Sequence, residues 1–338
     1  MIPLPLDAPP PPPPAPVNLL SRVPLPRVTG RQVRLAVSLL PLLLIAVWAV
    51  IDWEVVYGSA VRLASAELSW LLAGAVLAVL CSAATACIRQ GTVPERLPPG
   101  LLFASQFAAG AAGHVLPANL GAHAVTLRFL QRQGIPLPRA TASIALYSLV
   151  KPVARTAVIA VFVLALPGTL HLGDLLPDTR TLAVVAAAVA LALVAVVVTL
   201  TAVRVLRRHC IRLAQTALTD LRLVHRRPSR ALALWGGAAA LPVLQACVLA
   251  AVGASVDLPV SWPLMVFAYL AASTVVGAVP APGGIGPVDA AVVFTLVAFG
   301  APATLATTTV IGYRLLTVWL PLLPGTLVLS ALVRAKAL

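Results

Sequence analysis

Residues 279–291 read VPAPGGIGPVDAA and interrupt a long apolar run near the carboxyl end of the chain. A helix broken inside a bilayer leaves backbone N–H and C=O groups unpaired, so such breaks persist only where the backbone lines a cavity or is covered by protein. The stretch also contains a carboxylate, Asp289, which is costly in hydrocarbon. The break therefore predicts both a turn in the fold and a functional site.

The composition indicates which solvent surrounds the protein. Hydrophobic residues make up 60% of the chain and charged residues only 10%, whereas a soluble domain has about 25% charged residues. We therefore predict an all-α polytopic membrane helical bundle. No cofactor, disulfide framework or metal site is expected, because the four cysteines form no paired motif; they are Cys81, Cys87, Cys210 and Cys247.

The first thirty residues differ from the rest. They include DAPPPPPPAPV at 7–17, which can form neither a helix nor a core. Residues 1–30 are predicted to be a disordered, Pro-rich cytoplasmic tail with polyproline-like conformations. A Pro-rich recognition sequence is the alternative.

Membrane spans follow from apolar runs of about 20 residues. Six runs are clear, at 35–51, 69–87, 140–166, 181–203, 231–253 and 303–333. Two further apolar regions are interrupted: 100–133 at LPANLG (116–121), and 262–300 at PAPGGIG (280–286). We expect each of these to form a broken, re-entrant hairpin.

Orientation follows from the excess of arginine in cytoplasmic loops. Basic residues, mostly arginine, dominate the N-terminal segment, loop 88–99, loop 204–230 and the C-terminus, whereas acids outnumber basic residues in loops 52–68 and 167–180. Both termini are then cytoplasmic, and the protein lies in the cytoplasmic (plasma) membrane. Hairpin 100–133 enters and leaves from the cytoplasm, and hairpin 262–300 from the outer face.

The two halves therefore have the same order of elements in opposite orientations, which predicts an inverted repeat. The first half of the membrane domain spans 31–203, with the second repeat starting at 181. Residues 204–230 form a basic amphipathic cytoplasmic linker, whose apolar stripe and arginines suit an anionic membrane surface. Residues 231–338 complete the second repeat. Nucleic acid is excluded as a partner, because no reading module accompanies the arginines.

Four charged residues fall inside predicted spans or hairpins. Lys151 and Arg155 share one face of a helix, Arg314 lies at a similar depth in the last helix, and Asp289 follows the second break. Such residues usually face a cavity. Because one acid cannot neutralise three cations, we predict that an anion, most simply a phosphate, binds there. Snorkelling of the cations to the interface is the alternative.

The hairpin turns contribute further candidate residues. Pro287 suits the first position of a helix, so backbone N–H groups at that helix start could bind an anion. Asn119 is placed to cap the returning helix of the first hairpin. Asp289 could instead offset the helix dipole, and the turn glycines could serve close packing. The glycines assigned to substrate binding are Gly283, Gly284 and Gly286.

The sequences PAPGGIGPVDAAVVFTLVAFGAP (280–302) and YRLLTVWLPLLPG (313–325) resemble the C-terminal signature of the lysylphosphatidylglycerol synthase transmembrane-region family. The resemblance implies a flippase-like integral membrane protein that moves lipids between leaflets, and it adds Tyr313 to the site. Asp289 stands where the family usually has glutamate. Ala118 and Ala122 depart from the family pattern in the first hairpin. The matching positions are Pro282, Gly283, Gly284, Gly286, Asp289, Gly300, Tyr313, Arg314 and Gly325.

We therefore expect a lipid translocase for an anionic or phosphate-bearing lipid, and not an enzyme, because no synthase domain follows before Leu338. Direct use of ATP is not expected, since no phosphate-binding loop motif occurs. The alternatives are a membrane glycosyltransferase, with Asp52 and Glu54 as a metal-binding pair, and an accessory subunit of a lipid-modifying enzyme. Membrane lipids are the expected partners; a partner enzyme and a homo-oligomer are left open.

Overall fold

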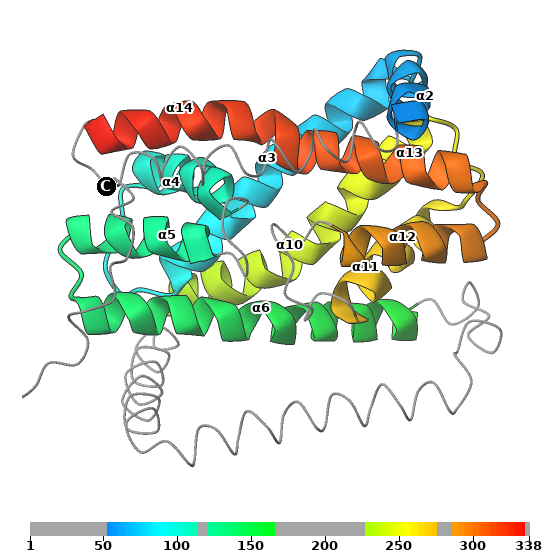
Figure 1. The fold of residues 1–338 in the computed structure, drawn as a ribbon. Coiled ribbons are helices and arrows are strands. Elements are labelled where there is room, and N and C mark those ends of the chain that lie inside the picture. The colour runs from blue at the N-terminus through cyan, green and yellow to red at the C-terminus, as the bar shows by residue number, and fades with distance from the viewer. Residues whose placement is uncertain (1–52, 114–119, 166–226, 276–285, 335–338) are drawn as a thin grey trace, which may run out of the picture.

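The computed structural model describes residues 53–113, 120–165, 227–275 and 286–334, and every regular element within these ranges is a helix (Figure 1). Four helices are long and apolar enough to cross a membrane, as the composition predicts. The prediction of an all-α polytopic bundle is confirmed. The elements are α2 (Trp53–Ala64), α3 (Leu68–Gly91), α4 (Pro99–Gly113), α5 (Leu120–Arg132), α6 (Leu137–Ala165), α10 (Pro228–Ser255), α11 (Trp262–Val275), α12 (Pro287–Ala298), α13 (Ala303–Arg314), the π-helix η4 (Leu315–Trp319) and α14 (Leu320–Arg334).

Several predicted segments lie outside the described residues. These are the tail, most of the linker and both hairpin turns, together with the predicted spans 35–51 and 181–203. The other four predicted spans each contain a helix, and both interrupted regions contain two shorter helices. The predicted breaks in 100–133 and 262–300 therefore separate α4 from α5 and α11 from α12.

Helices α3 and α10 pack against each other along most of their length. They are antiparallel, since Gly91 lies against Leu234 and Gly74 lies against Ala251. Small residues permit the close approach: a Cβ added to Gly237 would lie 2.9 Å from the Ala84 carbonyl oxygen. This packing of small residues is typical of helices in membranes, where close contact replaces the hydrophobic effect.

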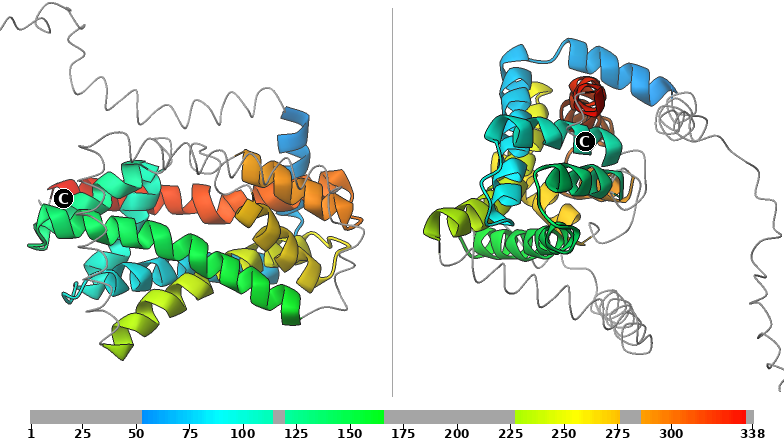
Figure 2. Two further views of the ribbon diagram at one scale, coloured as in Figure 1. Left: turned by 90° about the horizontal axis from the view of Figure 1, so that it is seen from below. Right: turned by 90° about the vertical axis from the view of Figure 1, so that its left-hand side faces the viewer.

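The two hairpins lie at opposite ends of this central pair, α4 and α5 at one end and α11 and α12 at the other (Figures 1 and 2). Helix α6 contacts both α5 and α11, and on the other side α13 contacts α12 while α14 contacts α4. Each long helix therefore packs against one helix from each hairpin. The arrangement places residues of α6 and α13–η4–α14 around the interior of the bundle.

The connections that lead into the two long helices have the same local structure. Gly134 follows α5 with φ of 81°, and Gly300 follows α12 with φ of 90°. In each case the next residue donates its backbone N–H to a carbonyl of the preceding helix, Leu130 at 3.1 Å and Leu296 at 3.0 Å. This is a Schellman-type helix end, for which glycine is favoured. The element order and these ends agree between the halves; their opposite orientation stays a prediction.

Two boundaries differ from the sequence-based predictions. The predicted outer loop 52–68 contains α2, which packs on α13, and Ser59 and Thr308 share a buried hydrogen bond of 3.2 Å. The acids at its ends suggested a loop, but tertiary packing supports a short helix. Helix α3 also continues past the predicted end at residue 87, so that Arg89 belongs to its last turn.

Candidate functional site

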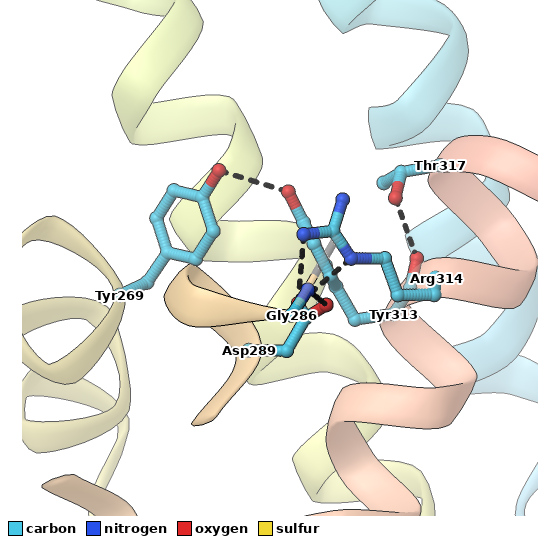
Figure 3. A network of polar contacts seen from close by, with 6 residues as sticks. All are labelled: Tyr269, Gly286, Asp289, Tyr313, Arg314 and Thr317. Carbon is cyan, nitrogen blue, oxygen red and sulfur yellow. Dashed lines mark hydrogen bonds and ion pairs between the residues drawn. The ribbon is translucent and has the colours of Figure 1, made fainter. Parts of the chain in front are cut away.

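Asp289 and Arg314 form an ion pair between α12 and α13 (Figure 3). Both the Nε and an Nη atom of Arg314 lie 2.7 Å from the same carboxylate oxygen of Asp289. Asp289 therefore neutralises one of the three cations that the sequence analysis placed inside the predicted spans. The ion pair joins α12, the second helix of the second hairpin, to α13, the first part of the last long helix.

The other carboxylate oxygen of Asp289 accepts a hydrogen bond of 3.1 Å from the backbone N–H of Gly286 (Figure 3). Pro287 is the first residue of α12 and Asp289 the third, as predicted. The same carboxylate therefore caps the helix start and neutralises Arg314. One backbone N–H at this helix start, which the sequence suggested for an external anion, is already satisfied by the protein.

Tyr313 extends the network next to the ion pair. Its hydroxyl group donates to the hydroxyl oxygen of Tyr269 on α11 at 2.9 Å, and both rings are buried (Figure 3). The Tyr313 carbonyl oxygen accepts a hydrogen bond of 2.7 Å from Thr317. These contacts hold α11, α12 and α13 together around Arg314.

The helix changes its winding directly after Arg314. Residues Leu315–Trp319 form a π-helical segment, η4, before α14 continues. Segments of this kind are rare and are frequent at functional sites. Here η4 places Thr317 and Val318 in the wall of a neighbouring cavity.

Arg155 on α6 is half-buried and is bound to α11. Its guanidinium donates a hydrogen bond of 2.8 Å to the backbone carbonyl of Ser273 on α11. Tyr269, which accepts the hydrogen bond from Tyr313, lies one helical turn before Ser273 on the same helix. No carboxylate pairs with Arg155 among the residues that the structure describes.

The cavity has a volume of about 280 Å³ and lies between α3, α4, α5, α6, α10 and the η4–α14 segment. Its wall combines apolar side chains with a group of polar ones that converge from five helices. These polar residues include Arg89, Gln106, His123, Tyr147, Lys151 and Gln245. Such a mixture of apolar wall and few polar groups is typical of ligand sites.

Two cations of this cavity contact one aromatic ring. The guanidinium carbon of Arg89 lies 3.6 Å from the centroid of the Tyr147 ring, and the ammonium of Lys151 lies 5.0 Å from it. Cation–π contacts of this kind stabilise a positive charge in a site with little water. Tyr147 therefore holds Arg89 and Lys151 near each other despite their like charge.

Several polar atoms in the cavity wall have no hydrogen-bond partner within the described parts of the chain. Arg89 is only 5% exposed, yet its Nε and one Nη atom are unpartnered. The same holds for Nδ1 of His123 and Oε1 of Gln245. Buried polar atoms are nearly always paired, so this group of unpaired atoms indicates a place for a ligand or ordered water.

The predicted site residues thus separate into two neighbouring groups. Arg314, Asp289, Tyr313 and Gly286 belong to the ion-pair network, whereas Lys151 lines the cavity. Arg155 is not among the residues that line the cavity and binds the Ser273 carbonyl oxygen on α11 instead. The other predicted site residues, Asn119, Gly283 and Gly284, lie outside the described residues.

Sequence reasoning missed the most buried cation and two carboxamides. Arg89 was assigned to the cytoplasmic loop 88–99, because a basic residue at the inner end of a span usually belongs to a loop. Gln106 and Gln245 carry no charge, so nothing in the apolar runs around them indicated a binding site.

The helices and their buried charges define a polytopic integral membrane protein with a polar interior site. The chain belongs to the lysylphosphatidylglycerol synthase transmembrane-region family, whose sequence model matches residues 31–325. No curated protein matches the chain in a sequence comparison. Membership confirms the resemblance and places the chain in a membrane-embedded family related to lipids.

Proposed function

We propose that this protein translocates an anionic or phosphate-bearing lipid between the leaflets of the cytoplasmic membrane, with both termini in the cytoplasm, and that it is not an enzyme. The proposal is supported chiefly by an imbalance of charge inside the bundle, where Arg89 is buried and Lys151 and Arg155 are half-buried. Within the described ranges, Arg89, Lys151 and Arg155 form no ion pair, and the one acid among the deep residues is committed to Arg314.

The energetic argument concerns the cost of these cations. Insertion scales give roughly 3 kcal/mol for a cation at the bilayer centre. An unpaired buried cation costs still more unless solvent or a counter-ion compensates it. An anionic headgroup that enters the cavity would supply the missing charge. A translocase needs such a polar place within the membrane, because a headgroup cannot cross hydrocarbon unaided.

The position of the ion-pair network beside a broken helix suggests where the translocation path runs. Asp289 and Arg314 connect the second hairpin to the last long helix, and η4 follows directly. In transporters, interrupted helices at corresponding positions of two repeats mark the site that opens alternately to each side. We place the translocation path between Lys151 of the first half and Arg314 of the second.

The test uses the full-length protein in vesicles that contain fluorescent phosphatidylglycerol. A reductant added outside quenches only the outer leaflet, so the rate of further quenching reports translocation. We expect Lys151→Gln and Arg155→Gln to lower this rate at least about tenfold each, because each removes a charge-assisted contact of about 1.5–3 kcal/mol. The matched control is Arg128→Gln, an exposed arginine on α5.

The outcome distinguishes the alternatives. If protein-containing vesicles move labelled phosphatidylglycerol no faster than empty vesicles, the translocase proposal fails. An accessory subunit would then be the better reading. If transport occurs but both glutamine variants match the control, the cations do not form the path.

A further inference from the structure

We infer that the cavity around Arg89 and Lys151 binds the phosphate of an anionic lipid whose headgroup also contains hydroxyl groups, and that it discriminates against headgroups of net positive charge. That the phosphate belongs to a lipid rests on the proposed function. That the cavity suits a phosphate follows from its own residues. The inference runs against the expectation that the family name suggests, which is a cationic lysyl headgroup.

The phosphate side of the site is formed by Arg89. This residue lies in the last turn of α3, is 5% exposed, and leaves Nε and one Nη atom without partners in the described structure. Arginine cannot lose its proton in a protein, so its charge persists in the cavity. Each of these unpartnered N–H groups can donate a charge-assisted hydrogen bond to a phosphate oxygen. Lys151 adds a point charge, since its ammonium group lies 5.0 Å from the centroid of the Tyr147 ring that Arg89 also contacts.

The charge of the wall determines which headgroups are accepted. The residues that line the cavity include Arg89 and Lys151 but neither aspartate nor glutamate among those described. An ammonium group that entered would meet two cations and find no counter-charge. A headgroup with an additional lysyl group is therefore disfavoured, and one with a single phosphate charge is favoured.

The remaining polar atoms specify hydrogen-bond donors on the ligand. The hydroxyl groups of Thr85 and Thr317 donate to their own helices, to the carbonyl oxygens of Cys81 and Tyr313, so towards the cavity they can only accept. Oε1 of Gln245 is an unpartnered acceptor within the described residues. Acceptors in a cationic cavity are best matched by neutral donors, which are hydroxyl groups. A polyol phosphate satisfies both parts of the wall.

The size of the cavity indicates how much of a lipid it holds. Its volume of about 280 Å³ lies just below the range of roughly 300–1,000 Å³ for sites that enclose drug-sized ligands. A headgroup fits in this space, whereas two acyl chains do not. The chains would remain against the apolar outer surface of the helices, in contact with lipid.

The experiment measures binding of short-chain lipids to the full-length protein in mild detergent by calorimetric titration. The probes are dihexanoyl forms of phosphatidylglycerol, phosphatidylethanolamine and lysyl-phosphatidylglycerol, together with glycerol phosphate. We expect phosphatidylglycerol to bind at least about tenfold more tightly than either nitrogen-containing lipid. If lysyl-phosphatidylglycerol binds equally or more tightly, the inference is overturned. If glycerol phosphate binds as well as the lipid, the ligand is a soluble phosphate and the lipid assignment is wrong.

Two variants assign the binding to this cavity. Arg89→Gln should weaken phosphatidylglycerol binding at least about tenfold, a loss that corresponds to about 1.4 kcal/mol, while the exposed Arg128→Gln leaves it unchanged. Lys151→Met provides the same test from a second helix if Arg89→Gln does not fold. Unchanged affinity in a folded variant of either residue would place the site elsewhere and refute the inference.

Binding and transport can fail separately. Selective binding that depends on Arg89, in a protein that moves no lipid between leaflets, would refute the proposed function and leave the inference intact. Conversely, transport of anionic and lysyl lipids at equal rates, unaffected by Arg89→Gln, would refute the inference and leave the translocase proposal standing.

Discussion

Asp289 binds Arg314 in a setting that differs from that of the other ion pair in the described structure. The side chains of Arg314 and Asp289 are 14% and 18% exposed, whereas those of Arg139 and Glu95 are 46% and 39% exposed. A pair removed from water depends on both partners, because neither charge can be solvated alone. An exposed pair is worth little, since water replaces a lost partner.

The first prediction follows from this contrast. Asp289→Asn should lower the free energy of unfolding by about 3–5 kcal/mol, because it leaves the Arg314 charge buried without its carboxylate. Arg139→Gln should change it by less than about 1 kcal/mol. Thermal unfolding in detergent checks both values. Equal effects of the two variants would mean that water reaches Arg314 freely.

The second prediction separates the stability of this pair from transport. Among molecules that remain folded, Arg314→Gln should lower transport of fluorescent phosphatidylglycerol at least about tenfold in reconstituted vesicles, because it removes a cation from the proposed path; like Asp289→Asn, it should also lower stability, since it leaves one partner of the pair alone. Among molecules that remain folded, Asp289→Asn should lower transport less, since it removes no cation. Transport at the unmodified rate in Arg314→Gln vesicles would remove Arg314 from the path.

The sequence predicted the fold well where a run of residues carries its own signal. Four long apolar runs became α3, α6, α10 and the α13–η4–α14 segment, and the Pro- and Gly-rich break at 280–286 separates α11 from α12. Helix α2 was not predicted, because its helical state depends on contact with α13. Packing between distant segments is invisible in a local pattern.

The site was predicted only in part, because some of its residues have a signal in the sequence and others are brought into it by packing alone. Lys151, Arg155, Arg314 and Asp289 stand out because charge is rare in apolar runs. Arg89 stands at a helix end, where an arginine is ordinary, and only the packing of α4, α6 and α10 buries it. The proximity of Lys151 to Arg89 and of Asp289 to Arg314 is a tertiary property that one sequence does not reveal.

The third prediction concerns the hydroxyl pair of Tyr313 and Tyr269. Tyr313→Phe should cost about 1–3 kcal/mol, because it leaves the buried hydroxyl of Tyr269 without its donor. The double variant Tyr313→Phe with Tyr269→Phe should regain most of this loss, since no polar group is then unpaired. A double-mutant cycle of unfolding free energies measures the coupling. Additive losses would show that each hydroxyl has another partner.

The last prediction tests the opposite orientation of the two halves. Pro136 precedes α6 and Pro302 precedes α13, each just after a glycine that ends the hairpin helix, and both are exposed. Inverted topology places Pro136 at the cytoplasmic face and Pro302 at the outer face.

Single-cysteine variants, Pro136→Cys and Pro302→Cys, would be made after Cys81, Cys87, Cys210 and Cys247 are replaced by alanine. A membrane-impermeant maleimide added to intact cells should label Pro302→Cys at once and Pro136→Cys only after permeabilisation. Because the two sites share local structure and exposure, a difference in labelling reports the side of the membrane and not local accessibility. Labelling of both from outside, or of neither, would show that the halves have the same orientation, and the prediction of an inverted repeat would then be wrong.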